Sequence, residues 1–144
     1  MNRLNSVIAI LDDDLNRLAA MRALLVKWFH GCEIAVFENA PDMVAWLKEN
    51  LQTVGLLSLD HDLGPNQLRD GVEFDPGTGR DVADFLATRP PQCNVILHTT
   101  NSLAAPGMLQ VLEDAGWSVS RVVPYGDLDW IGEVWINAVR CAMK

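Results

Sequence analysis

Short continuous runs of apolar residues alternate with segments of helical periodicity along most of the chain. The runs have the length of typical strands, and their continuity favours strands that are covered on both faces. They occupy residues 7–11, 33–37, 55–59 and 95–97, and the mixed segment 118–123 is predicted to be a fifth strand. Apolar residues three or four positions apart predict an amphipathic helix after each run. These helical repeats lie within residues 18–29, 44–51, 81–86, 108–112 and 131–142.

Five strand–helix units with mostly short connections are typical of an α/β protein. The pattern predicts a flavodoxin-like three-layer sandwich, with a five-stranded parallel sheet of order 2-1-3-4-5 and helices on both faces. We expect one domain over residues 1–144, because this length suits one domain and no linker interrupts the pattern. The long connection 63–78 is predicted to be irregular, either a loop that covers a ligand or a mobile solvated loop.

Composition narrows the range of partners. The formal net charge of -8 disfavours general duplex nucleic-acid binding and binding to anionic membranes, because both need clustered Lys and Arg. A small phosphorylated ligand held through a metal is compatible with this charge. No apolar run approaches the roughly 18–20 residues of a membrane span. Cys32, Cys93 and Cys141 lack metal-site spacing, so we expect a cytoplasmic protein whose cysteines are buried.

Acidic residues stand directly after two of the predicted strands. They are Asp12, Asp13 and Asp14 after the first strand, and Asp60 and Asp62 after the third. Because parallel strands bring their carboxyl ends to one edge of the sheet, where ligands bind, we expect these acids to meet. Carboxylate oxygens suit hard divalent cations such as Mg²⁺ or Mn²⁺. The alternatives are a helix cap at Asp13 or Asp14 and a solvated turn after the third strand.

Two histidines occupy the same predicted edge, His61 after the third strand and His98 after the fourth. Imidazole titrates near neutrality, so one ring can accept a proton while the other donates one, as the opening of a phosphodiester requires. Alternatively, each is a hydrogen-bonded structural residue. Thr99 and Asn101 are candidates to donate hydrogen bonds to a phosphate, with local turn chemistry as the alternative.

Taken together, these positions resemble response-regulator receiver domains over nearly the whole chain. The likeness rests on Asp12 and Asp13, Asp60, Thr99 and Pro124, which follow the first, third, fourth and fifth strands. It implies that the acidic pair and Asp60 bind Mg²⁺, that Asp60 accepts a phosphoryl group, and that the Thr99 hydroxyl holds this group.

Three departures favour an offshoot of the receivers. Val123 stands where receivers carry a Lys before the last strand's Pro, and Arg121 lies two positions back. The Asp60-His61-Asp62 strand end and the long glycine-containing loop are also unusual. Four motifs resemble the cyclic-phosphate processing receiver-like family, namely Leu11-Asp12-Asp13, Leu59-Asp60-His61-Asp62-Leu63-Gly64, Gly77-Thr78-Gly79-Arg80-Asp81-Val82 and Ile96-Leu97-His98-Thr99-Thr100-Asn101. This resemblance implies action on cyclic phosphates, with acids and added histidines on a receiver scaffold.

The leading hypothesis is a metal-dependent phosphoesterase that hydrolyses 2′,3′-cyclic nucleotide ends or similar small cyclic phosphates. The expected ligands of Mg²⁺ or Mn²⁺ are Asp12, Asp13 and Asp60, with Asp62 as a further ligand or an orienting residue. The expected catalytic residues are Asp60, His61 and His98, and the expected phosphate-binding residues are Thr99 and Asn101.

Two other functions stay open. One is a signalling receiver that is phosphorylated on Asp60, against which the missing Lys counts. The other is an interaction module with an inactive site, which contacts a protein partner through its receiver-like surface. Trp117, Trp130 and Trp135 are candidates for such a contact surface, although their spacing is more typical of core residues.

Overall fold

A computed structural model of the chain describes residues 6–144. Its central parallel sheet has the strand order β2-β1-β3-β6-β7, in which β6 and β7 are the fourth and fifth strands of the sheet. The strands are β1 (Val7–Leu11), β2 (Glu33–Phe37), β3 (Val54–Leu59), β6 (Asn94–Leu97) and β7 (Val119–Arg121). The predicted flavodoxin-like topology is confirmed, and the last strand is shorter than the predicted segment 118–123.

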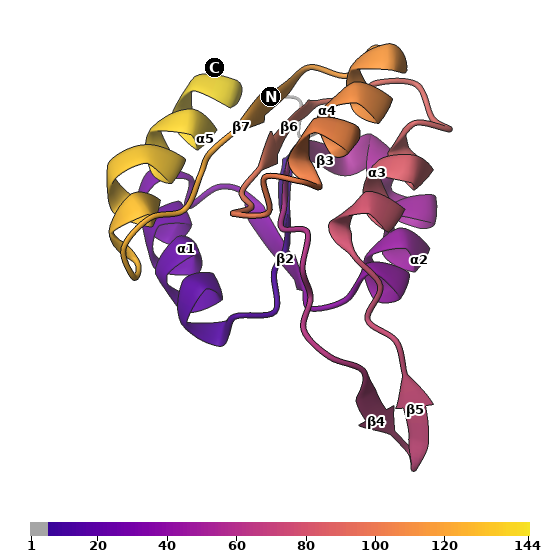
Figure 1. Ribbon diagram of the computed structural model, residues 1–144. Helices are drawn as coiled ribbons and strands as arrows, with labels where there is room; N and C mark the ends of the chain where they lie inside the picture. The colour runs from indigo at the N-terminus through magenta and orange to yellow at the C-terminus, as the bar shows by residue number, and fades with distance from the viewer. Residues whose placement is uncertain (1–5) are drawn as a thin grey trace.

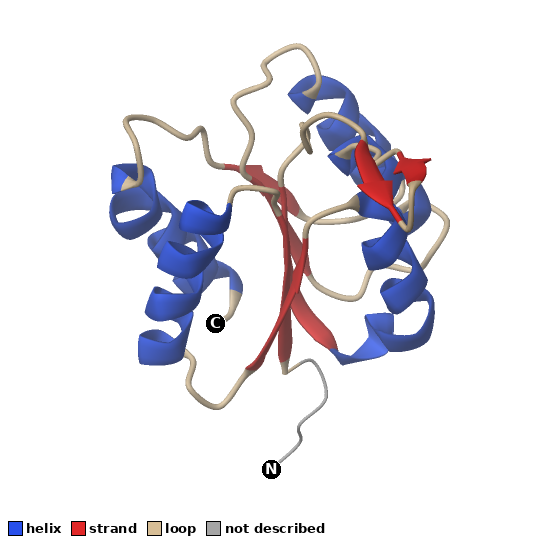
Figure 2. Cartoon of the chain, turned by 90° about the horizontal axis from the view of Figure 1, so that it is seen from below, coloured by secondary structure: helices blue, strands red, loops and turns tan. Residues whose placement is uncertain are grey.

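Helices cover both faces of this sheet (Figures 1 and 2). They are α1 (Leu15–Trp28), α2 (Ala40–Asn50), α3 (Gly79–Leu86), α4 (Ala105–Asp114) and α5 (Ile136–Ala142), with short helical turns η1 (Leu51–Thr53) and η2 (Ile131–Trp135). One face packs against α1, η2 and α5, and the other packs against α2, α3 and α4, which gives two separate apolar cores. No helix within residues 6–144 is long and apolar enough to cross a membrane.

The long connection after β3 contains a hairpin of β4 (Gln67–Arg69) and β5 (Val72–Phe74), which projects from the helical layers (Figure 1). Asp70 and Gly71 both have positive φ, as the two central residues of a type I′ turn require. Arg69 ties the hairpin to α2 through an ion pair of 2.8 Å with Asp42. The expectation of an irregular loop is therefore wrong, and the dipeptide Asp70-Gly71 was the signal for a hairpin.

The last helical segment begins with the five-residue π-helical turn η2, which places two tryptophans on the sheet side. Trp130 and Trp135 are both fully buried. Residues five apart point to different sides of an α-helix, whereas the i→i+5 repeat of a π-helix brings them toward one side. Trp117 is also buried and donates to the carbonyl oxygen of Leu86, so all three tryptophans belong to the core rather than to an exposed contact surface.

Candidate metal centre

Backbone hydrogen bonds continue one residue beyond β1, β3 and β6, and they fix the position of the polar residue that follows each strand. The backbone N–H of Asp12 donates to the carbonyl of Phe37, and that of Asp60 donates to the carbonyl of Leu11. The backbone N–H of His98 donates in turn to the carbonyl of Leu59. These bonds bring the three polar residues to one edge of the sheet, as the sequence predicted.

Three of the predicted acids form a compact cluster. Ligand oxygens of Asp12, Asp13 and Asp60 all lie within 4.8 Å of one another. Two oxygens on opposite sides of Mg²⁺ are about 4.2 Å apart, so this donor set fits a hard divalent cation after a small closure. Burial, followed by the nearby Asp12 carboxylate, raises the pKa of Asp60 to about 7. The same two causes raise the pKa of Asp13.

Asp14 lies outside this cluster and caps α1. Its carboxylate accepts hydrogen bonds from the backbone N–H groups of Asn16 at 2.9 Å and Arg17 at 3.1 Å. Its own N–H donates to Oδ1 of Asp12 at 2.8 Å, which helps to fix that carboxylate. The capping alternative for Asp14 therefore holds.

His98 lies in a buried chain of hydrogen bonds beneath the cluster. Nε1–H of Trp135 donates to Oγ of Ser58 at 3.0 Å, and that hydroxyl contacts Nδ1 of His98 at 2.7 Å. Nε2 of His98 lies 3.0 Å from Oδ2 of Asp12. If the Ser58 hydroxyl donates to Nδ1 of His98 and Nε2–H of His98 donates to Asp12, every donor and acceptor in this chain has a partner. Both ring nitrogens are occupied and the ring is fully buried, which does not suit the predicted acid–base role.

His61 forms a different pair at the outer side of the same edge. Its Nδ1 lies 2.8 Å from Oδ1 of Asp62, and its side chain is 15% exposed. The Asn101 amide also donates to Asp62, at 3.2 Å. Hydrogen bonds from His61 and Asn101 lower the pKa of Asp62, so its charged form is favoured. Among the residues that the structure describes, none forms a hydrogen bond with Nε2 of His61. Asp62 contacts His61 and is not a member of the three-carboxylate cluster, which suits an orienting role.

Thr99 and Asn101 form a turn after β6. Oγ1 of Thr99 accepts a hydrogen bond from the backbone N–H of Asn101 at 3.0 Å, which leaves its O–H as a donor. Oδ1 of Asn101 accepts from the backbone N–H of Ala104 at 2.9 Å. Asn101 is therefore held by turn contacts and by Asp62, whereas Thr99 is a buried hydroxyl.

The glycine motif before α3 is explained by close packing against the acidic strand end. A Cβ on Gly79 would lie 1.9 Å from the backbone oxygen of Asp60, so no larger residue fits there without displacing the strand end. The N–H of Gly79 donates to the carbonyl of His61 at 2.9 Å. Thr78 and Asp81 form a capping box that starts α3 at this point.

Arg17 is a site residue that the sequence predictions missed. Its Nη1 lies 3.7 Å from Oδ2 of Asp12 and 3.8 Å from Oδ2 of Asp60. The residue sits in the first turn of α1, directly after the acidic run. The sequence signal for this role is the position of Arg17, four residues or about one helical turn after Asp13.

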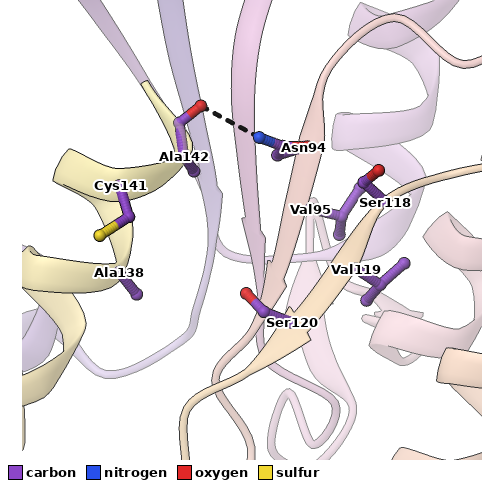
Figure 3. A pocket seen from close by; sticks show the side chains of 8 residues that line it. All are labelled: Asn94, Val95, Ser118, Val119, Ser120, Ala138, Cys141 and Ala142. Carbon is purple, nitrogen blue, oxygen red and sulfur yellow. Dashed lines mark hydrogen bonds between the residues drawn. The ribbon is translucent and has the colours of Figure 1, made fainter. Parts of the chain in front are cut away.

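A separate cavity of about 400 Å³ opens between α5 and the amino ends of β6 and β7 (Figure 3). Its lining includes Asn94, Ser118, Ser120 and Cys141, and Asn94 donates to the carbonyl of Ala142. Cys141 is exposed, and Cys32 and Cys93 are only partly buried, so the prediction that the cysteines are buried is wrong. The cavity lies at the opposite strand ends from the acids.

Solved structures with the same fold include response-regulator receivers. The phosphorylated cyanobacterial phytochrome response regulator RcpA is similar with a TM-score of 0.73 and 12% identity, covering 97% of this chain and 95% of that chain. A receiver domain from Rhodospirillum rubrum gives 0.62 and 19%, covering 95% and 91%. A response regulator from Burkholderia pseudomallei with a phosphorylated aspartic acid, a calcium ion and citrate gives 0.62 and 10%, covering 96% and 66%. A comparison with curated proteins finds no match.

The fold and the acidic strand ends thus define a receiver-like protein. The sequence model of the cyclic-phosphate processing receiver domain matches residues 7–114, from β1 to the end of α4. The chain therefore belongs to the cyclic-phosphate processing receiver domain family.

Proposed function

We propose that this protein is a metal-dependent phosphoesterase that opens small cyclic phosphates, such as 2′,3′-cyclic nucleotide ends. The observation that supports this most is the adjacency of two kinds of chemistry at one strand end. Asp60 belongs to a three-carboxylate cluster, and the next two residues, His61 and Asp62, form a hydrogen-bonded pair. The first group suits a cation and the second suits proton transfer.

Asp12, Asp13 and Asp60 are the residues that would hold Mg²⁺ or Mn²⁺. When bound, the cation supplies Lewis-acid polarisation of a phosphoryl oxygen and lowers the pKa of a bound water. The buried Thr99 hydroxyl is the candidate donor to a phosphate oxygen. Asn101 acts less directly, because its side chain already holds Asp62 and its own turn.

His61 is the general base in this proposal. Nδ1–H donates to Asp62, so the lone pair of Nε2 is free to accept a proton from the attacking water. The water oxygen bonds to phosphorus, the ring P–O bond breaks, and the released alkoxide takes the proton back from His61. His98 is a positioning residue, because its buried Nε2–H holds the Asp12 carboxylate.

Purified protein with Mg²⁺ or Mn²⁺, assayed on a panel of 2′,3′-cyclic nucleotides by ³¹P NMR, tests the proposal. We expect ring opening to a phosphomonoester and a loss of about 10²- to 10⁴-fold in kcat for His61→Gln, with metal binding retained. His30→Gln is the matched control, because His30 is exposed and lies outside the site. No turnover on any cyclic phosphate with either metal rejects the enzyme and favours an interaction module.

A second candidate is a receiver that is phosphorylated on Asp60. The observation in its favour is that Asp60 directly follows β3 and lies beside Asp12 and Asp13, as the receiver likeness implies for the phosphoacceptor. Against it stand the exposed Val123 in place of the Lys and the burial of Asp60. Intact mass after acetyl-phosphate treatment separates the two functions, because only the receiver acquires a labile adduct that Asp60→Asn abolishes.

A further inference from the structure

Arg17 covers the carboxylate cluster from the first turn of α1. Its backbone is fixed, because its N–H donates to the capping carboxylate of Asp14. Its guanidinium approaches Asp12 at 3.7 Å and Asp60 at 3.8 Å, and the side chain is 23% exposed. The group therefore stands between two buried acids and solvent.

The contacts of this guanidinium are electrostatic rather than hydrogen-bonded. Separations of 3.7 and 3.8 Å exceed hydrogen-bond range. The group lies over the ring of Trp130, with Cζ at 5.4 Å from the ring centroid, so it rests on a fixed aromatic surface. Within residues 6–144, no hydrogen bond engages the guanidinium, and its five N–H donors stay available.

Three other arginines of the described chain already donate to protein oxygens. Arg121 donates through Nη2 to the carbonyl of Thr99 at 3.0 Å, which turns it toward the backbone. Arg80 donates to Asp84, and Arg69 donates to Asp42. Within residues 6–144, Arg17 is the arginine that faces two acids of the cluster while no hydrogen bond engages its guanidinium.

The negative charge of the site explains why a positive charge at Arg17 would help to bind an anionic substrate. Three carboxylates and a divalent cation carry a net charge of about -1, and a phosphodiester anion makes it about -2, which opposes substrate binding at close range. The guanidinium of Arg17 adds one positive charge beside the carboxylates and so reduces the repulsion between the site and the phosphodiester. It also presents a planar pair of donors that matches two phosphate oxygens.

We propose that Arg17 is the anion-binding residue of this site. In the metal-free protein it neutralises Asp12 and Asp60. With Asp12 and Asp60 engaged by a divalent cation, Arg17 would no longer be attracted to them and would donate to the phosphate group of the substrate. The inference rests on the proposed metal-dependent function and adds a role for a residue outside the acidic and histidine motifs.

Binding measurements on Arg17→Gln test this role without any enzyme assay. Mn²⁺ affinity is measured by electron paramagnetic resonance, and binding of inorganic phosphate to the Mg²⁺-saturated protein is measured by calorimetry. We expect the variant to bind Mn²⁺ about tenfold more tightly, because a like charge is removed. We expect it to bind phosphate about tenfold more weakly, because a charge-assisted pair is lost.

Two further variants separate this role from a structural one. Arg22→Gln removes the same charge from an exposed position of α1 and should leave both affinities at the wild-type values. Arg17→Lys keeps the charge and should retain wild-type Mn²⁺ affinity, while phosphate binding falls between those of wild type and Arg17→Gln. If Arg17→Gln does not fold, the weaker phosphate binding expected of Arg17→Lys still tests the proposal.

The outcomes are distinguishable. Opposite shifts in the two affinities of Arg17→Gln support the inference. Unchanged affinities, or a weakening of both, overturn it while leaving the proposed function intact. If the wild-type protein binds neither Mn²⁺ nor phosphate, the proposed function fails first, and the role of Arg17 fails with it.

Discussion

Replacing Asp60 by Asn should stabilise the metal-free protein at alkaline pH. Asp60 is 6% exposed, and burial, together with the Asp12 carboxylate, makes its ionised form unfavourable in the folded chain. Asn is nearly isosteric and uncharged, and its side-chain oxygen can still accept the 2.8 Å hydrogen bond from the backbone N–H of His61. The substitution therefore removes the cost of a buried charge and leaves the local packing in place.

The size of the effect follows from the pKa of Asp60. A carboxyl group raised from 3.8 to about 7 costs about 4 kcal/mol to ionise in the folded state. Between pH 4 and pH 7 the folded chain binds the proton that the unfolded chain has released, so wild-type stability falls as pH rises through this window. The variant lacks this loss, so its advantage grows from pH 4 and levels off above pH 7. If relaxation halves the cost, about 2 kcal/mol remains, which corresponds to a Tm rise of about 6 °C.

Thermal unfolding of both proteins in chelator, at pH 5 and pH 8, measures this difference. Asp62→Asn is the matched control, because hydrogen bonds from His61 and Asn101 lower the pKa of Asp62 and its ionised form is not penalised. In saturating Mn²⁺ at pH 8, wild type should become more stable than Asp60→Asn, since wild type gains binding energy that the variant cannot match. An Asp60→Asn protein that is less stable than wild type in chelator at pH 8 would refute the argument that this charge is costly.

Two further substitutions test the supports of the site. Ser58→Ala leaves Nδ1 of His98 and Nε1–H of Trp135 without a buried partner, so the unfolding free energy should fall by about 2 kcal/mol in denaturant titration. Ser58→Thr, which keeps the hydroxyl, should lose less than Ser58→Ala, and equal losses would contradict the hydrogen-bond argument. Gly79→Ala places a methyl group against the carbonyl oxygen of Asp60 and should cost about 3 kcal/mol. Gly132→Ala meets no atom within 4 Å and should be tolerated in the same assay; similar losses in both glycine variants would exclude the clash as the cause.

The fold was predictable because its signals are local and redundant. The central strands β1, β3 and β6 appear as mostly apolar runs, and short connections between units leave few topologies open. The proximity of Asp12 and Asp60 was predictable for a similar reason, since both directly follow neighbouring parallel strands. The hairpin was missed because Asp70 and Gly71 were read as part of an irregular loop, although an Asp-Gly pair is a specific turn signal.

The roles of the two histidines were not predictable in the same way. His61 and His98 both follow apolar strands, and nothing in their immediate neighbours distinguishes them. The distinction comes from packing, because the π-helical turn brings Trp130 and Trp135 over β3 and β6 and closes His98 from solvent. A contact between residues so far apart in the chain leaves no local periodicity in the sequence.

The site thus divides into a buried half and an exposed half, with different consequences for substitution. In the buried half, Ser58 contacts His98, His98 contacts Asp12, and all three side chains are fully buried. Changes there should weaken metal binding and stability before they affect proton transfer. In the exposed half, His61 and Asp62 contact solvent, so changes there should lower turnover with little effect on folding. A phosphoacceptor receiver has no need of the exposed pair, and loss of function confined to that half would therefore favour the phosphoesterase over the signalling receiver.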